Sequence, residues 1–291
     1  MSFSSEALRI GAKVCKLDKV VDKWFHEPPR NTGAMQVDKF DKRLELEQWD
    51  VKGFKIITLK MKNSLDSHVI VLHGGAYTME AVSTHRKIME IFARDGHLKV
   101  SFIDYPLAPE NSASTTLSVV FQAYQEIATR NKGDQFCLFG DSAGGGLALA
   151  LLQMLRDNGI KPFPIKTALQ SPWLDVTMSN KKVKEVKKYD PILSIQGLID
   201  AGKQYAGDMD TRDPLISPLF GNLGNLGSVL LLAGTHEVFL PDCELLNKKL
   251  SKSAGSTVEF HIIDKMVHDW VIMPIKEAKQ TIMKIVDFYN K

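Results

Sequence analysis

Residues 135–157 read QFCLFGDSAGGGLALALLQMLRD, and this stretch decides the fold. An apolar run of strand length, 135–139, leads into Gly-Asp-Ser-Ala-Gly at 140–144, and a helix-forming segment follows at 147–156. A strand, Gly-x-Ser-x-Gly and a helix in this order are typical of a nucleophile elbow, a sharp turn that presents a serine hydroxyl above a sheet. The stretch therefore predicts an α/β fold with Ser142 as a candidate nucleophile.

The glycines around the serine are expected to have a steric role. Residues two positions away from a serine in such a strained turn would collide if they carried a Cβ, so Gly140 and Gly144 relieve the crowding. Gly145 and Gly146 follow in the first helical turn, where each costs about 1 kcal/mol of helix stability relative to alanine. That cost indicates that the helix backbone closely approaches another segment.

Length, charge and cysteine content limit the class of protein. The 291 residues suffice for one large α/β domain and are too few for two ordinary domains with a linker. The net charge of +3 is too small to favour nucleic acid as a partner. The three cysteines lack metal-ligand spacing and are odd in number, which favours a reducing compartment. No apolar run is long enough to span a membrane, so we expect a cytoplasmic protein without membrane insertion.

Strand-like and helix-like segments alternate along the chain from about residue 50. Further strands are expected at 55–59, 68–72, 99–103, 167–170, 229–233 and 258–263, and further helices at 84–95, 115–131, 242–254 and 275–289. Repeated strand–helix units predict a mostly parallel sheet with helices on both faces.

Two segments interrupt this alternation. Residues 1–45 carry one amphipathic helix, and residues 176–212 are polar, helix-prone and inserted between two strands. The apolar face of the first helix is formed by Ile10, Val14, Leu17, Val21 and Trp24. Because insertions at the carboxyl edge of such a sheet commonly cover a ligand crevice, we expect both segments to form one cap. The catalytic domain would then comprise residues 46–175 and 213–291.

A nucleophilic serine needs hydrogen-bond donors for the oxyanion that forms when it attacks. His-Gly-Gly-Ala-Tyr at 73–77 directly follows the strand expected at 68–72. Glycines there let backbone amides face a substrate oxygen. Together with the amide of Ala143, Gly74 and Gly75 are expected to form the oxyanion hole, and His73 is expected to brace their loop through hydrogen bonds.

The serine also needs a base and an acid. Of the eight histidines, only His268 lies in the loop between the last strand and the last helix, where a base is expected. Two carboxylates, Glu237 and Asp242, follow the strand at 229–233. Asp242 comes directly after Pro241 at a helix start, where helix capping explains an acidic residue. Glu237 is therefore the favoured acid, with Asp242 as the alternative.

The order of these motifs resembles that of the hormone-sensitive-lipase-like carboxylesterases, a family of α/β-hydrolases. The matching stretches are His73-Gly74-Gly75, Tyr105–Glu110, Gly140–Gly145, Ser171–Asp175, Asp213–Leu219 and the late His268. The resemblance implies an α/β-hydrolase fold with an eight-stranded, mostly parallel sheet flanked by helices, and a helical cap. It also implies a Ser-acid-His triad that hydrolyses short- to medium-chain acyl esters and requires no metal or other cofactor.

Three positions depart from the family's pattern. Ala76 stands at the fourth position of the usual His-Gly-Gly-Gly motif, where it keeps the amide. Pro106 replaces the arginine of the usual Tyr-Arg-Leu-Ala-Pro-Glu, so any contact of that arginine is absent. Glu237 stands where the family usually has aspartate, although some members use glutamate.

The expected reaction is transfer of an acyl group to water through an acyl-enzyme on Ser142. A small-molecule ester is the expected partner, and Tyr77 and Trp270 are candidate substrate contacts. An amidase, formamidase or carbohydrate deacetylase would use the same triad, and an inactive ligand-binding homologue is a further alternative. Because dimers are frequent among similar enzymes, a homodimer is also an expectation.

Overall fold

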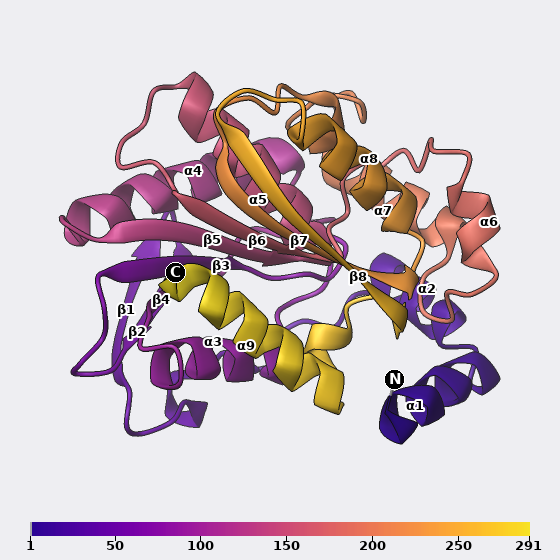
Figure 1. The fold of residues 1–291 in the computed structure, drawn as a ribbon, viewed down its shortest axis with the longest axis horizontal. Coiled ribbons are helices and arrows are strands. Elements are labelled where there is room, and N and C mark those ends of the chain that lie inside the picture. Colours follow the sequence, from indigo (N-terminus) through magenta and orange to yellow (C-terminus); the bar gives the residue numbers. More distant parts are fainter. Residues whose placement is uncertain (1) are drawn as a thin grey trace.

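The computed structural model describes residues 2–291, whose centre is an eight-stranded sheet in the order β1-β2-β4-β3-β5-β6-β7-β8 (Figure 1). The strands are β1 (Glu45–Val51), β2 (Phe54–Lys60), β3 (Ser67–Leu72), β4 (Lys99–Ile103), β5 (Gln135–Asp141), β6 (Lys166–Gln170), β7 (Gly227–His236) and β8 (Ser256–Val267). β2 runs antiparallel to both of its neighbours, and all other adjacent strands are parallel. The mostly parallel sheet and the α/β-hydrolase fold are thereby confirmed.

Helices cover both faces of the sheet. They are α1 (Phe3–Val14), α2 (Leu17–His26), α3 (Ser83–Arg94), α4 (Ala113–Arg130), α5 (Ser142–Asp157), α6 (Val183–Lys187), α7 (Ile195–Ala206), α8 (Leu240–Leu250) and α9 (Lys276–Asn290). α3 and α9 lie on one face, and α4, α5 and α8 lie on the other (Figure 1). Both faces are covered because successive side chains of a strand point to opposite sides of the sheet. In β5, Leu138 packs toward α4 and α5, and Phe139 packs toward α3 and α9.

The first strand, β1, was not expected from the sequence. It is an edge strand that pairs only with β2, and most of its side chains are exposed or half-buried. Glu45, Glu47 and Asp50 lie within it. Charged side chains are common on edge strands, where they oppose pairing with another chain, and they hide the apolar alternation by which a strand is usually recognised.

The N-terminal segment differs from the single amphipathic helix that was expected. Lys16 adopts a left-handed backbone (φ 50°) and separates α1 from α2. Because this break changes the direction of the chain, the five apolar residues do not share one buried face. Val21 of α2 is buried, whereas Ile10 and Val14 of α1 are 50% and 75% exposed. No helix within residues 2–291 combines the length and the apolar character that a bilayer crossing requires.

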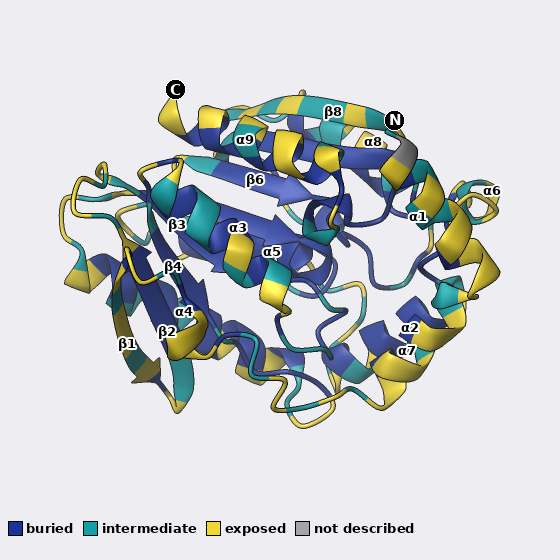
Figure 2. Cartoon of the chain, turned by 90° about the horizontal axis from the view of Figure 1, so that it is seen from below, coloured by how far each residue is buried: buried dark blue, intermediate teal, exposed yellow. Residues whose placement is uncertain are grey.

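Helices α2 and α7 lie side by side above the carboxyl edge of the sheet, although they come from distant parts of the sequence (Figures 1 and 2). The Ser194 hydroxyl donates to both carboxylate oxygens of Asp22 at 2.7 Å. The Lys187 ammonium lies 3.4 Å from the Asp18 carboxylate. Polar contacts therefore join residues of the N-terminal segment to residues of the 176–212 insertion.

Candidate active site

Ser142 occupies the turn between β5 and α5. Its φ of 51° is the left-handed conformation that an L-residue adopts only under strain. A Cβ on Gly144 would overlap the carbonyl oxygen of Leu72, and one on Gly140 would overlap the carbonyl oxygen of Gly144. The expected steric role of these two glycines is confirmed.

The two glycines that follow allow α5 to approach the segment after β6. A Cβ on Gly145 would meet Pro172, and one on Gly146 would overlap the carbonyl oxygen of Trp173. The Trp173 amide also donates to the Ser142 carbonyl at 2.8 Å. The close approach that Gly145 and Gly146 indicated is therefore found between α5 and the Ser171–Asp175 segment.

Three side chains from three loops form a continuous hydrogen-bonded line. His268 Nε2 lies 3.0 Å from Ser142 Oγ, and His268 Nδ1 lies 3.0 Å from Glu237 Oε2. Since a carboxylate can only accept, Nδ1 carries the proton toward Glu237 and Nε2 is free to accept the serine proton. The three residues follow β5, β7 and β8, whose carboxyl ends meet at one edge of the sheet.

Glu237 is fully buried, and this burial raises the pKa of its carboxyl. The hydrogen bond from His268 opposes that rise by favouring the charged form. The Gly234 amide also donates to Glu237 Oε1 at 2.6 Å. The carboxylate is therefore held in one position, from which it can stabilise a protonated imidazole.

Asp242, the alternative acid, contacts Asn180 and not the triad histidine. Its Oδ1 accepts a hydrogen bond of 2.8 Å from Asn180 Nδ2, and it lies in the first turn of α8. Burial raises the pKa of Asp242 to about 6. The structure thus brings Glu237, and not Asp242, to His268.

The expected oxyanion hole needs one revision. The Gly74 amide donates to Asp141 Oδ2 at 2.9 Å and is therefore not free to bind a substrate oxygen. Across residues 2–291, the Gly75 and Ala76 amides meet no backbone or side-chain acceptor. Ala143, the second residue of α5, has no intrahelical acceptor for its amide. The free donors beside Ser142 are thus Gly75, Ala76 and Ala143.

The loop that carries these amides is braced by His73, as expected. His73 Nδ1 lies 2.6 Å from the Gly74 carbonyl oxygen, and its ring stacks on Tyr105 at 4.4 Å. Tyr105 in turn donates its hydroxyl to the His73 carbonyl at 2.6 Å. Burial lowers the pKa of His73 to about 4, so the ring is neutral near neutral pH.

A mainly apolar cavity of about 330 Å³ opens onto Ser142 and His268. Its apolar wall comes from α2, the loops after β3 and β8, and the insertion, through Val21, Trp24, Phe25, Pro29, Met79, Val82, Ile192, Leu193, Ile272 and Met273. The expected substrate contacts, Tyr77 and Trp270, do not line it. Tyr77 is buried and stacks on Tyr205 at 3.7 Å. Trp270 is buried and donates its indole N–H to Thr281 at 2.9 Å.

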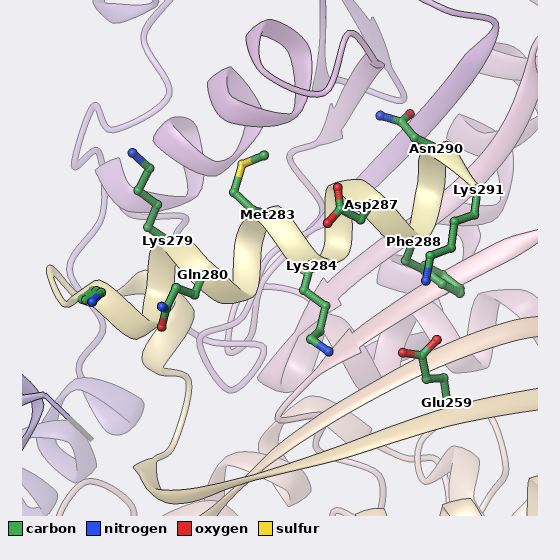
Figure 3. Close-up of a pocket in the computed structure, with 10 residues that line it drawn as sticks. Glu259, Lys279, Gln280, Met283, Lys284, Asp287, Phe288, Asn290 and Lys291 are labelled. Carbon is green, nitrogen blue, oxygen red and sulfur yellow. The ribbon is translucent and has the colours of Figure 1, made fainter.

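A second hollow, of about 820 Å³, runs along α9 beside β8 (Figure 3). Lys279 and Lys284 project from opposite sides of α9, and its lining contains no histidine, serine or cysteine. A site without a serine or an imidazole base cannot perform the chemistry that the serine motif indicates. The cavity at Ser142 is therefore the candidate active site.

Sequence reasoning missed three buried side chains around this site. Asp141 and Asp269 are the immediate neighbours of Ser142 and His268, and His85 Nε2 lies 3.0 Å from Asp141 Oδ2. The available signal was an acidic residue beside both the nucleophile and the base. His85 carried no such signal, because α3 brings it to the site only in the folded chain.

Comparisons with known proteins agree with the fold. A sequence profile described as the alpha/beta hydrolase fold matches residues 69–272. An esterase of Acinetobacter venetianus is 31% identical over 234 residues, which are 79% of this chain and 77% of that protein. An acetyl-hydrolase of Streptomyces hygroscopicus is 30% identical over 203 residues, or 69% of this chain and 67% of that protein.

Solved structures are similar over nearly the whole chain. A crystal structure of the esterase EstE5, soaked with p-nitrophenyl butyrate, has a TM-score of 0.79 and 29% identity, covering 94% of this chain and 97% of that one. An esterase from the bacterial hormone-sensitive lipase family has a TM-score of 0.83 and 26% identity, covering 99% and 98%. The similarity therefore extends beyond the segment that the family profile matches.

Proposed function

Because the chain belongs to the alpha/beta hydrolase fold family and is a carboxylic ester hydrolase, we propose that it cleaves short- to medium-chain acyl esters with Ser142, His268 and Glu237. One observation carries this proposal. The line from the Glu237 carboxylate through the imidazole to the Ser142 hydroxyl is unbroken, with both contacts at 3.0 Å. Such a line is what a serine hydroxyl needs to become a nucleophile near neutral pH.

The reaction proceeds in two halves. As Ser142 Oγ bonds to the ester carbonyl carbon, its proton moves to His268 Nε2, and Glu237 stabilises the resulting imidazolium. The carbonyl oxygen becomes an oxyanion that faces the amides of Gly75, Ala76 and Ala143. The carbon–alkoxy oxygen bond then breaks, and the imidazolium protonates the leaving alcohol. A water molecule deprotonated by His268 attacks the acyl-enzyme, which releases the acid and restores Ser142.

The size and lining of the cavity support the proposed acyl range. At about 330 Å³ it lies near the lower end of the ~300–1,000 Å³ that ligand sites usually occupy. Its wall is mostly apolar, so it favours an aliphatic chain over a charged or sugar-like group. The related EstE5 crystals were soaked with p-nitrophenyl butyrate, and this four-carbon acyl ester is a suitable first substrate.

The deciding experiment compares Ser142→Ala with the wild-type protein. The wild type should release a burst of p-nitrophenol from p-nitrophenyl butyrate and react with a fluorophosphonate probe. The variant should do neither and should lose about 10⁴-fold or more in kcat. Ser118→Ala is the matched control, because Ser118 is exposed on α4, where its hydroxyl accepts a hydrogen bond from Lys52, and does not line the cavity. Undiminished turnover in Ser142→Ala would refute the assignment.

A substrate panel tests the remaining part of the proposal. Matched p-nitrophenyl esters from acetate to dodecanoate should show kcat/KM falling beyond medium chains, because the cavity volume limits the acyl group. The corresponding anilides and acetylated sugars belong in the same panel. Faster turnover of an anilide or an acetylated sugar than of every ester would replace the esterase assignment with an amidase or a deacetylase.

A further inference from the structure

Two buried carboxyl groups meet beside the triad, and the proposed hydrolysis uses neither of them as acid or base. Asp141 is the last residue of β5 and precedes Ser142, and Asp269 directly follows His268. Asp141 is 0% exposed and Asp269 is 6% exposed. Burying two such groups is costly unless hydrogen bonds or a shared proton compensate for the lost hydration.

Asp141 connects two elements of the site. Its Oδ2 accepts the Gly74 amide at 2.9 Å, which fixes the start of the loop that carries the free amides of Gly75 and Ala76. The same oxygen lies 3.0 Å from His85 Nε2 of α3. On the other side, the Asp269 backbone amide donates to Ser171 Oγ at 3.3 Å, and the Asp269 side chain lines the substrate cavity.

One oxygen of each carboxyl group lacks a hydrogen-bond donor among the described residues. Asp141 Oδ1 and Asp269 Oδ1 are both buried, and neither has a donor among residues 2–291. The two side chains are close enough for each to shift the pKa of the other. Because ionised carboxylates only accept, a hydrogen bond between them requires a proton on one of the two. A single proton shared by the pair would give these unpaired oxygens a partner.

The surroundings decide which group carries the proton. Burial and the adjacent Asp141 charge raise the pKa of Asp269 well above its ordinary value, and Glu237 adds to this. Burial also opposes the charge on Asp141, but the interaction of its carboxylate with His85, whose Nε2 lies 3.0 Å from Oδ2, outweighs this, and the pKa of Asp141 is lowered. Asp269 is thus the neutral acid of the pair, and a neutral acid suits the wall of an apolar cavity.

We propose that Asp269 is a positioning residue, which donates a hydrogen bond to Asp141 and so holds the oxyanion loop and the His268 loop together. This inference rests on the function proposed above. The bond joins the chain immediately after the base to the chain immediately before the nucleophile. Through the Gly74 amide it extends to the donors that bind the oxyanion. A displacement of about 1 Å among such groups is enough to slow a reaction 100-fold.

The sign of the pH dependence follows from the shared proton. Asp269 binds its proton more tightly in the folded protein than in the unfolded one, so its contribution to stability is lost as pH rises through its raised pKa. Loss of the proton leaves two anions in contact. His85 and His73 act on Asp141 from the α3 and β3 side, and Glu237 acts on Asp269 from the β7 side. His268 of the β8 side is the chain neighbour of Asp269. Because Glu237 is a third carboxylate near the pair, the repulsion drives the two loops apart.

Asp269→Asn tests this positioning role. The asparagine amide keeps a donor for Asp141 but has no proton to lose, so kcat should remain within about fivefold of wild type near neutral pH. Its kcat should then persist at alkaline pH where wild-type kcat falls, with KM following the same course in both proteins. Asp264→Asn is the matched control, because Asp264 is exposed on β8, and it should reproduce the wild-type profile.

The kcat of Asp269→Ala and infrared spectra of the wild-type protein complete the test. Asp269→Ala removes the donor, so its kcat should fall about tenfold or more at all pH values. In infrared spectra at mildly alkaline pH, the folded wild-type protein should keep a protonated carboxyl band that Asp269→Asn lacks. Identical alkaline limbs in wild type and Asp269→Asn, or absence of that band, overturn this inference alone. Loss of all ester turnover and probe labelling from the wild type would instead overturn the proposed function.

Discussion

The carboxyl edge of the sheet and the expected cap above it, residues 1–45 and 176–212, are held by different contacts. At the edge, backbone atoms touch at Gly140 and Gly144, where no Cβ fits. In the cap, side chains rather than backbone atoms join α2 to α7, through polar contacts such as that between Asp22 and Ser194 and through apolar residues such as Phe25. Trp24 of the cap remains 43% exposed although it also lines the cavity.

This difference assigns different tasks to the two regions. Steric exclusion and buried hydrogen bonds leave the reacting groups one arrangement, which is what chemistry at a carbonyl carbon requires. Polar contacts at a half-exposed surface are weaker, so the wall of the cavity can vary without disturbing the triad. We therefore propose that the edge determines the reaction and that the expected cap, residues 1–45 and 176–212, limits which acyl chain fits.

The largest expected effect comes from adding one methyl group at the edge. Gly144→Ala places a Cβ on the carbonyl oxygen of Leu72, and this overlap should destabilise the fold by about 3 kcal/mol or more and abolish esterase activity. Urea unfolding and p-nitrophenyl butyrate turnover measure both effects.

The matched control is the same substitution in the cap. Gly11 lies in α1 with no atom within 4 Å of the added Cβ. Gly11→Ala should raise helix stability by up to about 1 kcal/mol and leave kcat unchanged. An equal loss of unfolding free energy in Gly144→Ala and Gly11→Ala would contradict the proposed difference between the edge and the cap.

The next largest effect is expected at the acid. Glu237→Gln keeps the shape of the side chain but allows the amide to donate toward His268, which favours the wrong imidazole tautomer. The kcat for p-nitrophenyl butyrate should fall by about 10²–10⁴-fold with little change in KM. A kcat within threefold of wild type would remove Glu237 from the triad.

The edge was predictable from the sequence because covalent neighbours define it. The Gly-x-Ser-x-Gly turn follows its strand directly, and the order of strands placed Glu237 and His268 at the same edge as Ser142. The occupied Gly74 amide was not predictable, because its acceptor on Asp141 is 67 residues away and only the fold brings the two together.

The cap was less predictable because contacts between residues far apart in the sequence build it. The break at Lys16 leaves no signal in a helix-forming run with steady apolar spacing. Tyr77 and Trp270 are aromatic neighbours of site motifs in the sequence, yet both side chains pack in the core and do not line the cavity. Adjacency in sequence therefore located the catalytic groups better than the substrate contacts.

A smaller effect should follow from loosening the cap. Arg30 donates two hydrogen bonds to the Glu110 carboxylate, at 3.0 and 2.7 Å, and one to the Ala108 carbonyl at 2.8 Å. Its neighbours Pro29 and Thr32 line the cavity. Arg30→Lys keeps the charge but loses this fork, so KM for the butyrate ester should rise about three- to tenfold while kcat stays within about twofold.

Arg43→Lys is the control for the loss of an arginine fork. Arg43 forms a comparable pair with Asp41 but lies outside the cavity lining. Its KM should equal that of wild type for acetate and butyrate esters alike. A fall in kcat for Arg30→Lys, with KM constant, would mean that the cap positions the reacting groups as well as the acyl chain.

The smallest effect on activity is expected at Asp242, where α8 meets Asn180 of the insertion. Burial raises the pKa of this carboxyl from 3.8 to about 6, and nearby Asp175 raises it further while Asn180 opposes the rise. The folded state therefore holds the proton more tightly than the unfolded state. The stability that this proton provides is lost as pH rises through about 6.

Asp242→Asn avoids that loss and keeps an acceptor for Asn180. In urea unfolding it should match wild type in acid and exceed it by about 2 kcal/mol at neutral pH. Because Asp242 does not contact His268, kcat should stay constant across the same range, and a changed kcat would show that this junction reaches the catalytic edge.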